Sequence, residues 1–488
     1  MTENSVSENT KKSVVWYTVL PFVMHLLRFA NSILLARLLA PEDFGVISVV
    51  TILLYYSNSL TDFGMSNAVV QRKTVDRTHY GALFSFNFLV SIVLFLAFQL
   101  SAEAIAEFYD TDELAAALKT FAFVFLISAF LSGPKADLRR QIKFKTLSII
   151  EAIKVVSSIC VSLTLALNGF GLWSIIFAML VAQSISTILT IYFSDIRFAF
   201  RCTKTSFKEL FNFSLWSFLN IQVTLISDNI DKLILGKVLD IRALGIFDKG
   251  VGLAKMPDEQ LSGRLATVAF STFSRKQDNI EELEYYFCRL LTITMMLAFP
   301  VFIGLHIVAT DFTLVLLGPK WAEMIPVLEL IAFAFLLNSL LRHVTVFNLA
   351  VGKIKHQVGL RFLATIIMVT VLLFVAKFGL VAVSHTLIGF YFGLLIFSFL
   401  LANQLLKIEW SKVLSLLLAP VLSSLLMSAS VFTVQHFLAD FHDGYRLLLS
   451  IFVGGGSYAL CVLTLPFSHW TFVRNNVNGR IRKLTKLA

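Results

Sequence analysis

Residues 33–47 read ILLARLLAPEDFGVI, and residues 233–247 read LILGKVLDIRALGIF. At eleven of the fifteen aligned positions the two residues are identical or of the same kind. A second pair of stretches, FAFVFLISAFL at 121–131 and IAFAFLLNSLL at 331–341, follows in the same order at a displacement of 210 residues. Matches that keep their order at a nearly constant displacement indicate an internal duplication, and repeats of this kind occur in many membrane transporters.

The composition indicates a membrane protein built from helices. Of the 488 residues, 57% are hydrophobic and 15% are charged, and the mean hydropathy is +0.79. A soluble globular domain has about a quarter charged residues. A helix that spans a bilayer needs roughly 20 mostly apolar residues, so we predict an all-α polytopic membrane protein with about fourteen transmembrane helices. The predicted spans are 13–38, 44–66, 80–100, 114–133, 147–167, 171–193, 211–236, 243–263, 285–308, 324–350, 358–376, 379–402, 413–434 and 445–466.

The Lys and Arg residues are concentrated in every second segment between these spans, and this alternation predicts which segments face the cytoplasm. Of the 41, 27 fall in predicted cytoplasmic segments, six in or beside external ones and eight within helices. Cytoplasmic loops retain Lys and Arg, so both termini are predicted to be cytoplasmic. The same asymmetry accounts for the net charge of +10. Anionic membrane lipids are therefore the predicted partners of these charges, and nucleic acid is not.

The duplication divides the predicted helices into two equivalent lobes. The displacement makes helices 1–6 equivalent to helices 7–12, and because six is even, both repeats enter the membrane in the same direction. Helices 13 and 14 follow outside the repeat. The predicted organisation is a cytoplasmic N-terminal segment at 1–12, a first lobe at 13–193, a basic cytoplasmic linker at 194–210, a second lobe at 211–402, two further helices at 413–466 and a basic cytoplasmic tail at 467–488.

Four of the predicted spans carry polar side chains three or four residues apart, which places them on one face of each helix. These stripes comprise His25 and Arg28 in the first span, Asn58 and Asp62 in the second, Asn220, Asp228, Asp231 and Lys232 in the seventh, and Lys255 and Glu259 in the eighth. A charge at the bilayer centre is costly, so the stripes predict a water-filled cavity between the lobes, lined by helices 1, 2, 7 and 8. The alternative is pairing between helices, for instance of Arg28 with Asp228 or Asp231.

Two further intramembrane cations receive different interpretations. Arg342 lies deep in the tenth span, and we include it among the residues of the predicted cavity. Lys154 lies within about two turns of the cytoplasmic end of its span, where a long side chain reaches the headgroups. We therefore predict that Lys154 snorkels to the membrane surface.

Sequence motifs of enzymes are absent. There is no Gly-rich phosphate loop, no His, Cys and Asp cluster with metal-ligand spacing, and no long external loop with paired carboxylates. The four cysteines are widely spaced and show no disulfide framework. The sequence therefore predicts a transporter and not an enzyme, with no cofactor and no metal site.

Two stretches carry a family resemblance. ILLARLLAPEDFGVISVV at 33–50 and DFGMSNAVVQR at 62–72 resemble the polysaccharide exporters of the Wzx type, which belong to the multidrug/oligosaccharidyl-lipid/polysaccharide flippase superfamily. The resemblance covers nearly the whole chain and implies two MATE-like lobes that work by alternating access. It also implies a location in the bacterial inner membrane. The implied cargo is an undecaprenyl-pyrophosphate-linked oligosaccharide, moved to the outer leaflet for O-antigen, capsule or exopolysaccharide synthesis. A polysaccharide polymerase and chain-length machinery are the implied protein partners.

The polar residues fit that cargo chemically. A pyrophosphate needs Arg or Lys inside the membrane, and Arg can bind it with two parallel hydrogen bonds. The sugars need hydrogen-bonding side chains such as amides. The predicted cavity residues are His25, Arg28, Asn58, Asp62, Asn220, Lys232, Lys255 and Arg342. The predicted residues for coupling to a proton or sodium gradient are Asp228, Asp231 and Glu259.

Two other functions stay open at this point. A multidrug or small-molecule cation-coupled antiporter of the same superfamily would favour an acidic, aromatic cavity, whereas the stripes here mix cations with the acids. A membrane glycosyltransferase or polymerase would need a long external catalytic loop. The sequence leaves open the sugar, the coupling ion, the stoichiometry and the oligomeric state.

Overall fold

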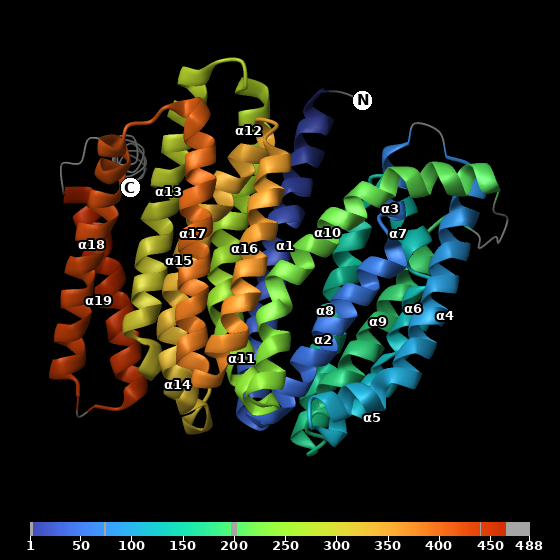
Figure 1. Ribbon diagram of the computed structural model, residues 1–488, viewed down its shortest axis with the longest axis horizontal. Coiled ribbons are helices and arrows are strands. Elements are labelled where there is room, and N and C mark those ends of the chain that lie inside the picture. The colour runs from blue at the N-terminus through green and yellow to red at the C-terminus, as the bar shows by residue number, and fades with distance from the viewer. Residues whose placement is uncertain (1–2, 73–74, 197–202, 440, 465–488) are drawn as a thin grey trace. The chain divides into compact units, whose positions relative to one another are not determined.

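A computed structural model describes residues 3–72, 75–196, 203–439 and 441–464, and the predicted basic tail at 467–488 lies outside them (Figure 1). Within this described part every regular element is a helix, so the predicted all-α fold class is confirmed. The first helix already begins at Glu3. Most of the predicted N-terminal segment 1–12 is therefore a helical extension of the first span.

The described residues of the first half of the chain form ten α-helices and the beginning of an eleventh. They are α1 (Glu3–Leu38), α2 (Pro41–Asp62), α3 (Met65–Gln71), α4 (Arg77–Phe108), α5 (Asp112–Phe121), α6 (Phe123–Ser128), α7 (Ser132–Arg140), α8 (Phe144–Leu167), α9 (Trp173–Phe193), α10 (Lys204–Val238) and α11 (Ile241–Asp258). Local chemistry sets their ends. The Asp76 carboxylate, for example, caps α4 by accepting hydrogen bonds from the backbone N–H groups of Thr78 and His79 at 2.9 and 3.1 Å.

The second half is also helical in its described part. After α11 come a π-helix (Glu259–Gly263), α12 (Arg264–Lys276), α13 (Ile280–Ile307), α14 (Ala309–Leu316), a 3-10 helix (Pro319–Met324), α15 (Ile325–Ala350), α16 (Ile354–Val375), a 3-10 turn (Ala376–Phe378), α17 (Leu380–Leu406), α18 (Trp410–Phe437) and α19 (Asp443–Thr464). The chain packs into two compact units, Met1–Gly245 and Ile246–Ala488. In the first, α10 packs against α2, α3 and α4; in the second, α18 and α19 lie side by side (Figure 1).

Ten helices of the described residues are long and apolar enough to cross a membrane. The pair Asp112–Ser128 and Ser132–Arg140, bent by 45°, makes an eleventh if it is one broken span. Its first part corresponds to the predicted fourth span at 114–133, whereas most of Ser132–Arg140 lies in the basic gap that sequence analysis places after this span. The remaining predicted spans coincide with α1, α10 and α11, which carry three of the polar stripes. The multi-span membrane character is confirmed, and the count of fourteen stays a prediction.

The two aligned stretches of the repeat adopt the same local geometry. α1 ends at Leu38 and α2 begins at Pro41, and 200 residues later α10 ends at Val238 and α11 begins at Ile241. The backbone N–H that follows each helix end donates to the carbonyl four residues earlier, at 2.8 Å in the first case and 3.0 Å in the second. Both stretches are therefore the same helix–turn–helix unit.

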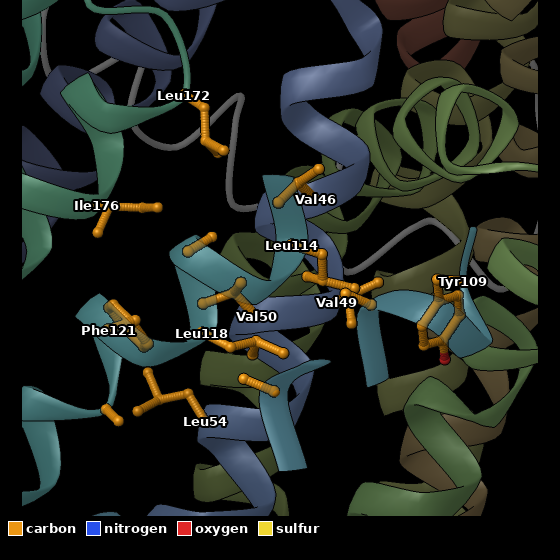
Figure 2. Close-up of a cluster of buried hydrophobic side chains, with 14 of the residues drawn as sticks. Val46, Val49, Val50, Leu54, Tyr109, Leu114, Leu118, Phe121, Leu172 and Ile176 are labelled. Atoms are coloured by element: carbon orange, nitrogen blue, oxygen red, sulfur yellow. The ribbon is translucent and has the colours of Figure 1, made fainter. Parts of the chain in front are cut away.

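A buried apolar cluster joins α2, α4, α5, α6 and α9 in the first unit. Its residues include Val46, Val49, Val50, Leu54, Tyr109, Leu114, Leu118, Phe121, Leu172 and Ile176, which Figure 2 labels. Ile241 and Leu244, at the start of α11, belong to the same cluster. Lipid tails are as apolar as leucine, so such a cluster stabilises a membrane protein through close packing of its side chains. It also forms part of the wall of the site described next.

Candidate functional site

A cavity of about 480 Å³ lies within the first unit, lined by residues of α1, α2, α5, α6, α8 and α9. Its polar lining consists of Arg28, Asn31, Ser32, Thr51, Tyr55, Asn58, Ser128, Lys154, Ser158 and Gln183. Two adjoining cavities, of about 340 and 330 Å³, share lining residues with it. Lys154 lines all three. We call the three together the N-unit hollow.

The predicted stripes of the first two spans line this hollow. On α1, His25 and Arg28 lie one turn apart and line the 340 Å³ cavity, and Arg28 also lines the largest one. On α2, Asn58 and Asp62 lie one turn apart and line the 330 Å³ cavity. The structure therefore brings these four predicted residues around one hollow. The spacing of three or four residues is the sequence signal that identifies them.

The charges around the hollow are predominantly positive. Its charged lining residues are the cations Arg28, Lys135, Arg139 and Lys154 and the carboxylates Asp62 and Glu151. Four cations against two carboxylates leave a formal charge of +2. In surroundings of low dielectric constant such a charge attracts an anion more strongly than it would in water.

Arg28 is paired within the first unit. Its Nη2 donates a hydrogen bond to Oε1 of Glu151 on α8, and the two side chains are 47% and 52% exposed. This partner differs from the alternative pairing of Arg28 with Asp228 or Asp231 considered for the sequence. Because both groups are half exposed to the hollow, the guanidinium keeps donors that an entering anion can reach.

Lys154 corrects the sequence interpretation. Its amino group donates to the side-chain oxygen of Gln183 on α9 at 2.9 Å, and the Gln183 amide donates in turn to Ser128 Oγ on α6 at 2.9 Å. The predicted snorkelling is therefore wrong, because the ammonium bonds to a neutral amide inside the bundle and lines the hollow. Sequence analysis identified no stripe on α8, although Glu151, Lys154 and Ser158 recur there at intervals of three and four residues.

The carboxylate of Asp62 lies at the end of α2. It accepts a hydrogen bond from Ser66 Oγ, and the intervening Phe63 and Gly64 have left-handed backbone conformations, with φ of 47° and 74°. This turn lets α3 fold back beside the hollow. Asp62 shares the 330 Å³ cavity with Lys135 and Arg139. Its negative charge therefore faces two cations across the cavity.

The predicted residues of α10 lie elsewhere in the first unit. Lys232 is half-buried, Asp231 is buried and Asp228 is exposed, and none of them lines the N-unit hollow. Both aspartates act electrostatically on Tyr56 of α2, whose hydroxyl donates to the carbonyl of Leu225 at 3.1 Å. The side chain of Asn220 lies outside the described part of the structure.

The remaining predicted residues belong to the second unit. Lys255 and Glu259 are half-exposed and form an ion pair one turn apart, with 3.7 Å between Nζ and Oε1. Arg342 forms an ion pair with Asp258, with 2.5 Å between Nη2 and Oδ2. Sequence analysis missed Asp258, although the neighbouring Pro257 marks a helix break. These residues are described within the second unit alone, so the predicted cavity between the lobes stays a prediction.

A polytopic bundle of helices with a charged, partly open hollow inside the membrane defines a transport protein. The family model described as "Polysaccharide biosynthesis protein" matches residues 34–326, and the chain belongs to this family. The resemblance seen at 33–50 and 62–72 is thereby confirmed.

Curated relatives are similar over most of their length. An uncharacterized membrane protein in the cps region of Klebsiella pneumoniae is 26% identical, over 76% of this chain and 77% of the relative. The lipopolysaccharide biosynthesis protein WzxC of Escherichia coli (strain K12) is 24% identical over 73% of each chain. The teichuronic acid biosynthesis protein TuaB of Bacillus subtilis (strain 168) is 23% identical over 94% of this chain and 96% of the relative.

Solved structures show the same fold. The lipid II flippase MurJ in an inward closed conformation superposes with a TM-score of 0.76 at 15% identity, covering 92% of this chain and 98% of the other. A multidrug resistance MATE family transporter of the MOP superfamily, in an inward-facing conformation, gives a TM-score of 0.62 at 14% identity over 79% and 96% of the two chains. The predicted MATE-like architecture is confirmed as a fold, and at these identities the likeness extends no further.

Proposed function

We propose that this protein is a flippase that moves a polyprenyl-pyrophosphate-linked oligosaccharide across the bacterial inner membrane by alternating access. The observation that carries the proposal is the formal charge of +2 around the N-unit hollow. A pyrophosphate headgroup is anionic and has acceptor oxygens for Arg28 and Lys154, while the amides of Asn58 and Gln183 suit sugar hydroxyls.

The names of similar proteins support the same cargo class. Relatives are a lipopolysaccharide biosynthesis protein and a succinoglycan biosynthesis transport protein, and the solved structure with the TM-score of 0.76 is a lipid II flippase. The product of such a flippase is a repeat unit in the outer leaflet, where a polysaccharide polymerase and chain-length machinery would use it. The Lys and Arg asymmetry supports cytoplasmic termini.

Transport assays in liposomes test the proposal against the antiporter alternative. Purified protein is reconstituted and supplied in parallel with a lipid-linked oligosaccharide and a fluorescent cationic drug. We expect flux of the lipid-linked sugar only, because the cationic hollow repels a cationic drug. Drug flux without sugar flux would establish the antiporter instead.

The variant pair for this assay is Arg28→Ala and Lys119→Met. Arg28→Ala removes a cation that lines the hollow, and loss of charged hydrogen bonds of this type lowers affinity by about 10- to 100-fold. Lys119 is the matched control, because its amino group also pairs with a glutamate, Glu103, at 2.6 Å, but it does not line the hollow. Equal losses in both variants would show that the position in the hollow does not matter.

A further inference from the structure

A groove of about 400 Å³ runs between α16 and α17, which pack against each other in the second unit (Figure 1). Its lining recurs every three or four residues on each helix and includes Leu360, Leu363, Ile367 and Val371 on α16 and Thr386, Gly389, Gly393 and Phe397 on α17. Residues at these intervals share one face of a helix. The groove is therefore continuous along the two facing helices.

Two glycines leave this groove open. A Cβ atom added to Gly389 or Gly393 would meet no heavy atom of the described chain within 4 Å. Small residues four positions apart in a membrane helix usually allow a second helix to approach closely. No described segment makes that approach here. The space in front of the two glycines can therefore hold a group from outside the described chain.

The lining of the groove suits an apolar occupant. Thr386 carries the one hydroxyl among the described lining residues, and this hydroxyl donates to the carbonyl of Ala382 in its own helix at 3.1 Å. Leu363, Ile367 and Phe397 are 56%, 55% and 59% exposed, so the groove opens outward. Both helices are apolar enough to span a membrane, where lipid chains surround them.

The length of the groove matches one leaflet of a bilayer. Leu360 and Val371 are eleven residues apart, as are Thr386 and Phe397, which corresponds to about 16 Å along a helix. The hydrocarbon core is about 30 Å thick, so one leaflet contributes about 15 Å. Another helix is about as wide as the spacing of two packed helices and would rest on the rim of the groove. A single extended hydrocarbon chain fits along its floor.

One end of the groove is basic. α16 begins within the stretch GKIKHQVGLR at 352–361, which contains Lys353, Lys355 and Arg361 and no acidic residue. The alternation of Lys and Arg along the chain predicts that this stretch is cytoplasmic. Basic residues on that side of a membrane attract anionic lipid headgroups.

Lys353 fixes one positive charge at this end. Its Nζ donates to the carbonyl of Leu401 on α17 at 2.7 Å and to Oε1 of Gln404 at 3.4 Å. Leu401 lies about one turn after Phe397, so the ammonium joins the two helices where the groove ends. An ammonium group has three N–H donors, and these two bonds leave the third for an anion.

We propose that this groove binds an anionic phospholipid, with one acyl chain between α16 and α17 and the phosphate beside Lys353. The phosphate neutralises the ammonium, and the acyl chain covers the apolar floor that the two glycines leave open. A lipid at this place joins α16 and α17 in addition to their direct packing. Neither contact involves the N-unit hollow or its cargo, so the proposal is independent of the proposed function.

Lipid titrations of delipidated protein test the headgroup. Purified protein in detergent receives phosphatidylglycerol or, in parallel, phosphatidylethanolamine with the same acyl chains, and native mass spectrometry counts the bound lipids. We expect one tightly bound phosphatidylglycerol, with an affinity about 10- to 100-fold above that of phosphatidylethanolamine, whose own ammonium already neutralises its phosphate. Equal affinities for the two lipids, or no tight binding of either, would overturn the proposal.

Filling the groove tests the site of the acyl chain. Gly389→Leu/Gly393→Leu places two side chains in the groove and should abolish the tight binding of phosphatidylglycerol. Gly455→Leu/Gly456→Leu on α19 is the matched control, because these exposed glycines also have no heavy atom within 4 Å of an added Cβ but do not line the groove. Equal losses in both variants would refute the site. If the first variant does not fold, Ala364→Phe blocks the groove from α16 and should abolish the binding as well.

A charge variant tests the site of the phosphate. Lys353→Met should lower the affinity for phosphatidylglycerol to that for phosphatidylethanolamine. Lys377→Met is the control, because Lys377 lies beyond the other end of α16. We expect this variant to bind phosphatidylglycerol as the wild type does. An unchanged affinity in Lys353→Met, or an equal loss in Lys377→Met, would contradict the assigned position of the phosphate.

Other occupants of the groove give different results. A second copy of the chain would make the wild type a dimer in detergent, and Gly389→Leu/Gly393→Leu a monomer, as measured by light scattering. The polyprenyl chain of the cargo would make undecaprenyl phosphate displace phosphatidylglycerol at equal concentration. Either result would overturn the proposal, and we expect neither.

Discussion

A methyl group on Gly245 would lie 2.8 Å from the backbone nitrogen of Gly45 and 1.9 Å from the carbonyl oxygen of Pro41. A methyl group on Gly45 would lie 1.8 Å from the carbonyl oxygen of Ile241. These contacts are reciprocal, because Pro41 and Ile241 are also 200 residues apart. The starts of α2 and α11 thus cross backbone against backbone at equivalent residues of the repeat. Small residues permit such close approach between helices in membranes.

The first prediction concerns this crossing. Gly45→Ala should destabilise the protein by about 1–3 kcal/mol, because overpacked backbones must shift apart. The thermal unfolding midpoint in detergent, followed by fluorescence-detected gel filtration, measures the loss. Gly389→Ala is the control, since an added Cβ there meets no atom within 4 Å. An unchanged midpoint for Gly45→Ala would contradict the close crossing.

The second prediction separates backbone fit from charge at the same crossing. Arg242 Nη1 lies 3.0 Å from Glu42 Oε1, and the two side chains are 43% and 49% exposed. Exposed ion pairs contribute about 0–1 kcal/mol and weaken with salt. A double-mutant cycle with Glu42→Ala and Arg242→Ala should therefore give a small coupling energy. A coupling larger than the cost of Gly45→Ala would show that the ion pair holds the crossing.

The third prediction asks whether Arg28 only pairs with Glu151 or also binds cargo. The neutral double variant Arg28→Gln/Glu151→Gln removes the ion pair without leaving an unpaired charge, so the fold should be kept. We expect it to lose flux of the lipid-linked sugar as fully as Arg28→Ala, while its expression and unfolding midpoint stay near those of the wild type. Normal flux in the double variant would mean that Arg28 has a structural role only.

The fourth prediction concerns Lys154, which lines all three cavities of the hollow. Lys154→Met keeps the length of the side chain but removes the charge, and we expect affinity for undecaprenyl pyrophosphate to fall by about 10- to 100-fold. Lys154→Arg should retain binding. The measurement is a binding titration in detergent. Lys119→Met serves again as the charge-matched control, and equal weakening there would argue against a direct contact.

The fifth prediction fixes the orientation of the chain. Reporter fusions at residues 107, 240, 315 and 440 should report the outside, and fusions at 140, 203 and 357 should report the inside, because the basic gaps stay cytoplasmic. Alkaline phosphatase and fluorescent-protein fusions together give a signal on either side. A reporter that gives the opposite side at any of these positions would refute the fourteen-span topology.

Hydropathy was sufficient to predict the ten long apolar helices of the described residues, because a bilayer imposes a minimum apolar length on each of them. It did not predict the 45° bend between Asp112–Ser128 and Ser132–Arg140. The second part, SGPKADLRR, carries four charged residues and was assigned to a basic gap between spans, so its continuation of the helix was not predicted. Repeat matches at 33–47 and 233–247 predicted the duplicated turn, but not that its two copies touch.

The site was predictable only where polar residues recur on one helix face. His25, Arg28, Asn58 and Asp62 were found in this way. Lys154 was missed although Glu151, Lys154 and Ser158 also recur on one face of α8, because its distance of about two turns from the cytoplasmic end of the span favoured snorkelling. Asp258 was missed because it lies one residue off the predicted stripe, which is about 100° around the helix. Only the packing of α15 shows that this face, and not that of Glu259, is buried.

The apolar cluster of the first unit determines which part of the cavity wall can contact water and ions. Leu54, Phe121 and Val124 belong both to this cluster and to the wall of the 480 Å³ cavity. Water and ions that enter the cavity meet a dry wall there, in which no side chain can relay a proton or coordinate an ion. A headgroup in the cavity would therefore be solvated only from the opposite, polar part of the lining, which fixes the side toward which its charge is held.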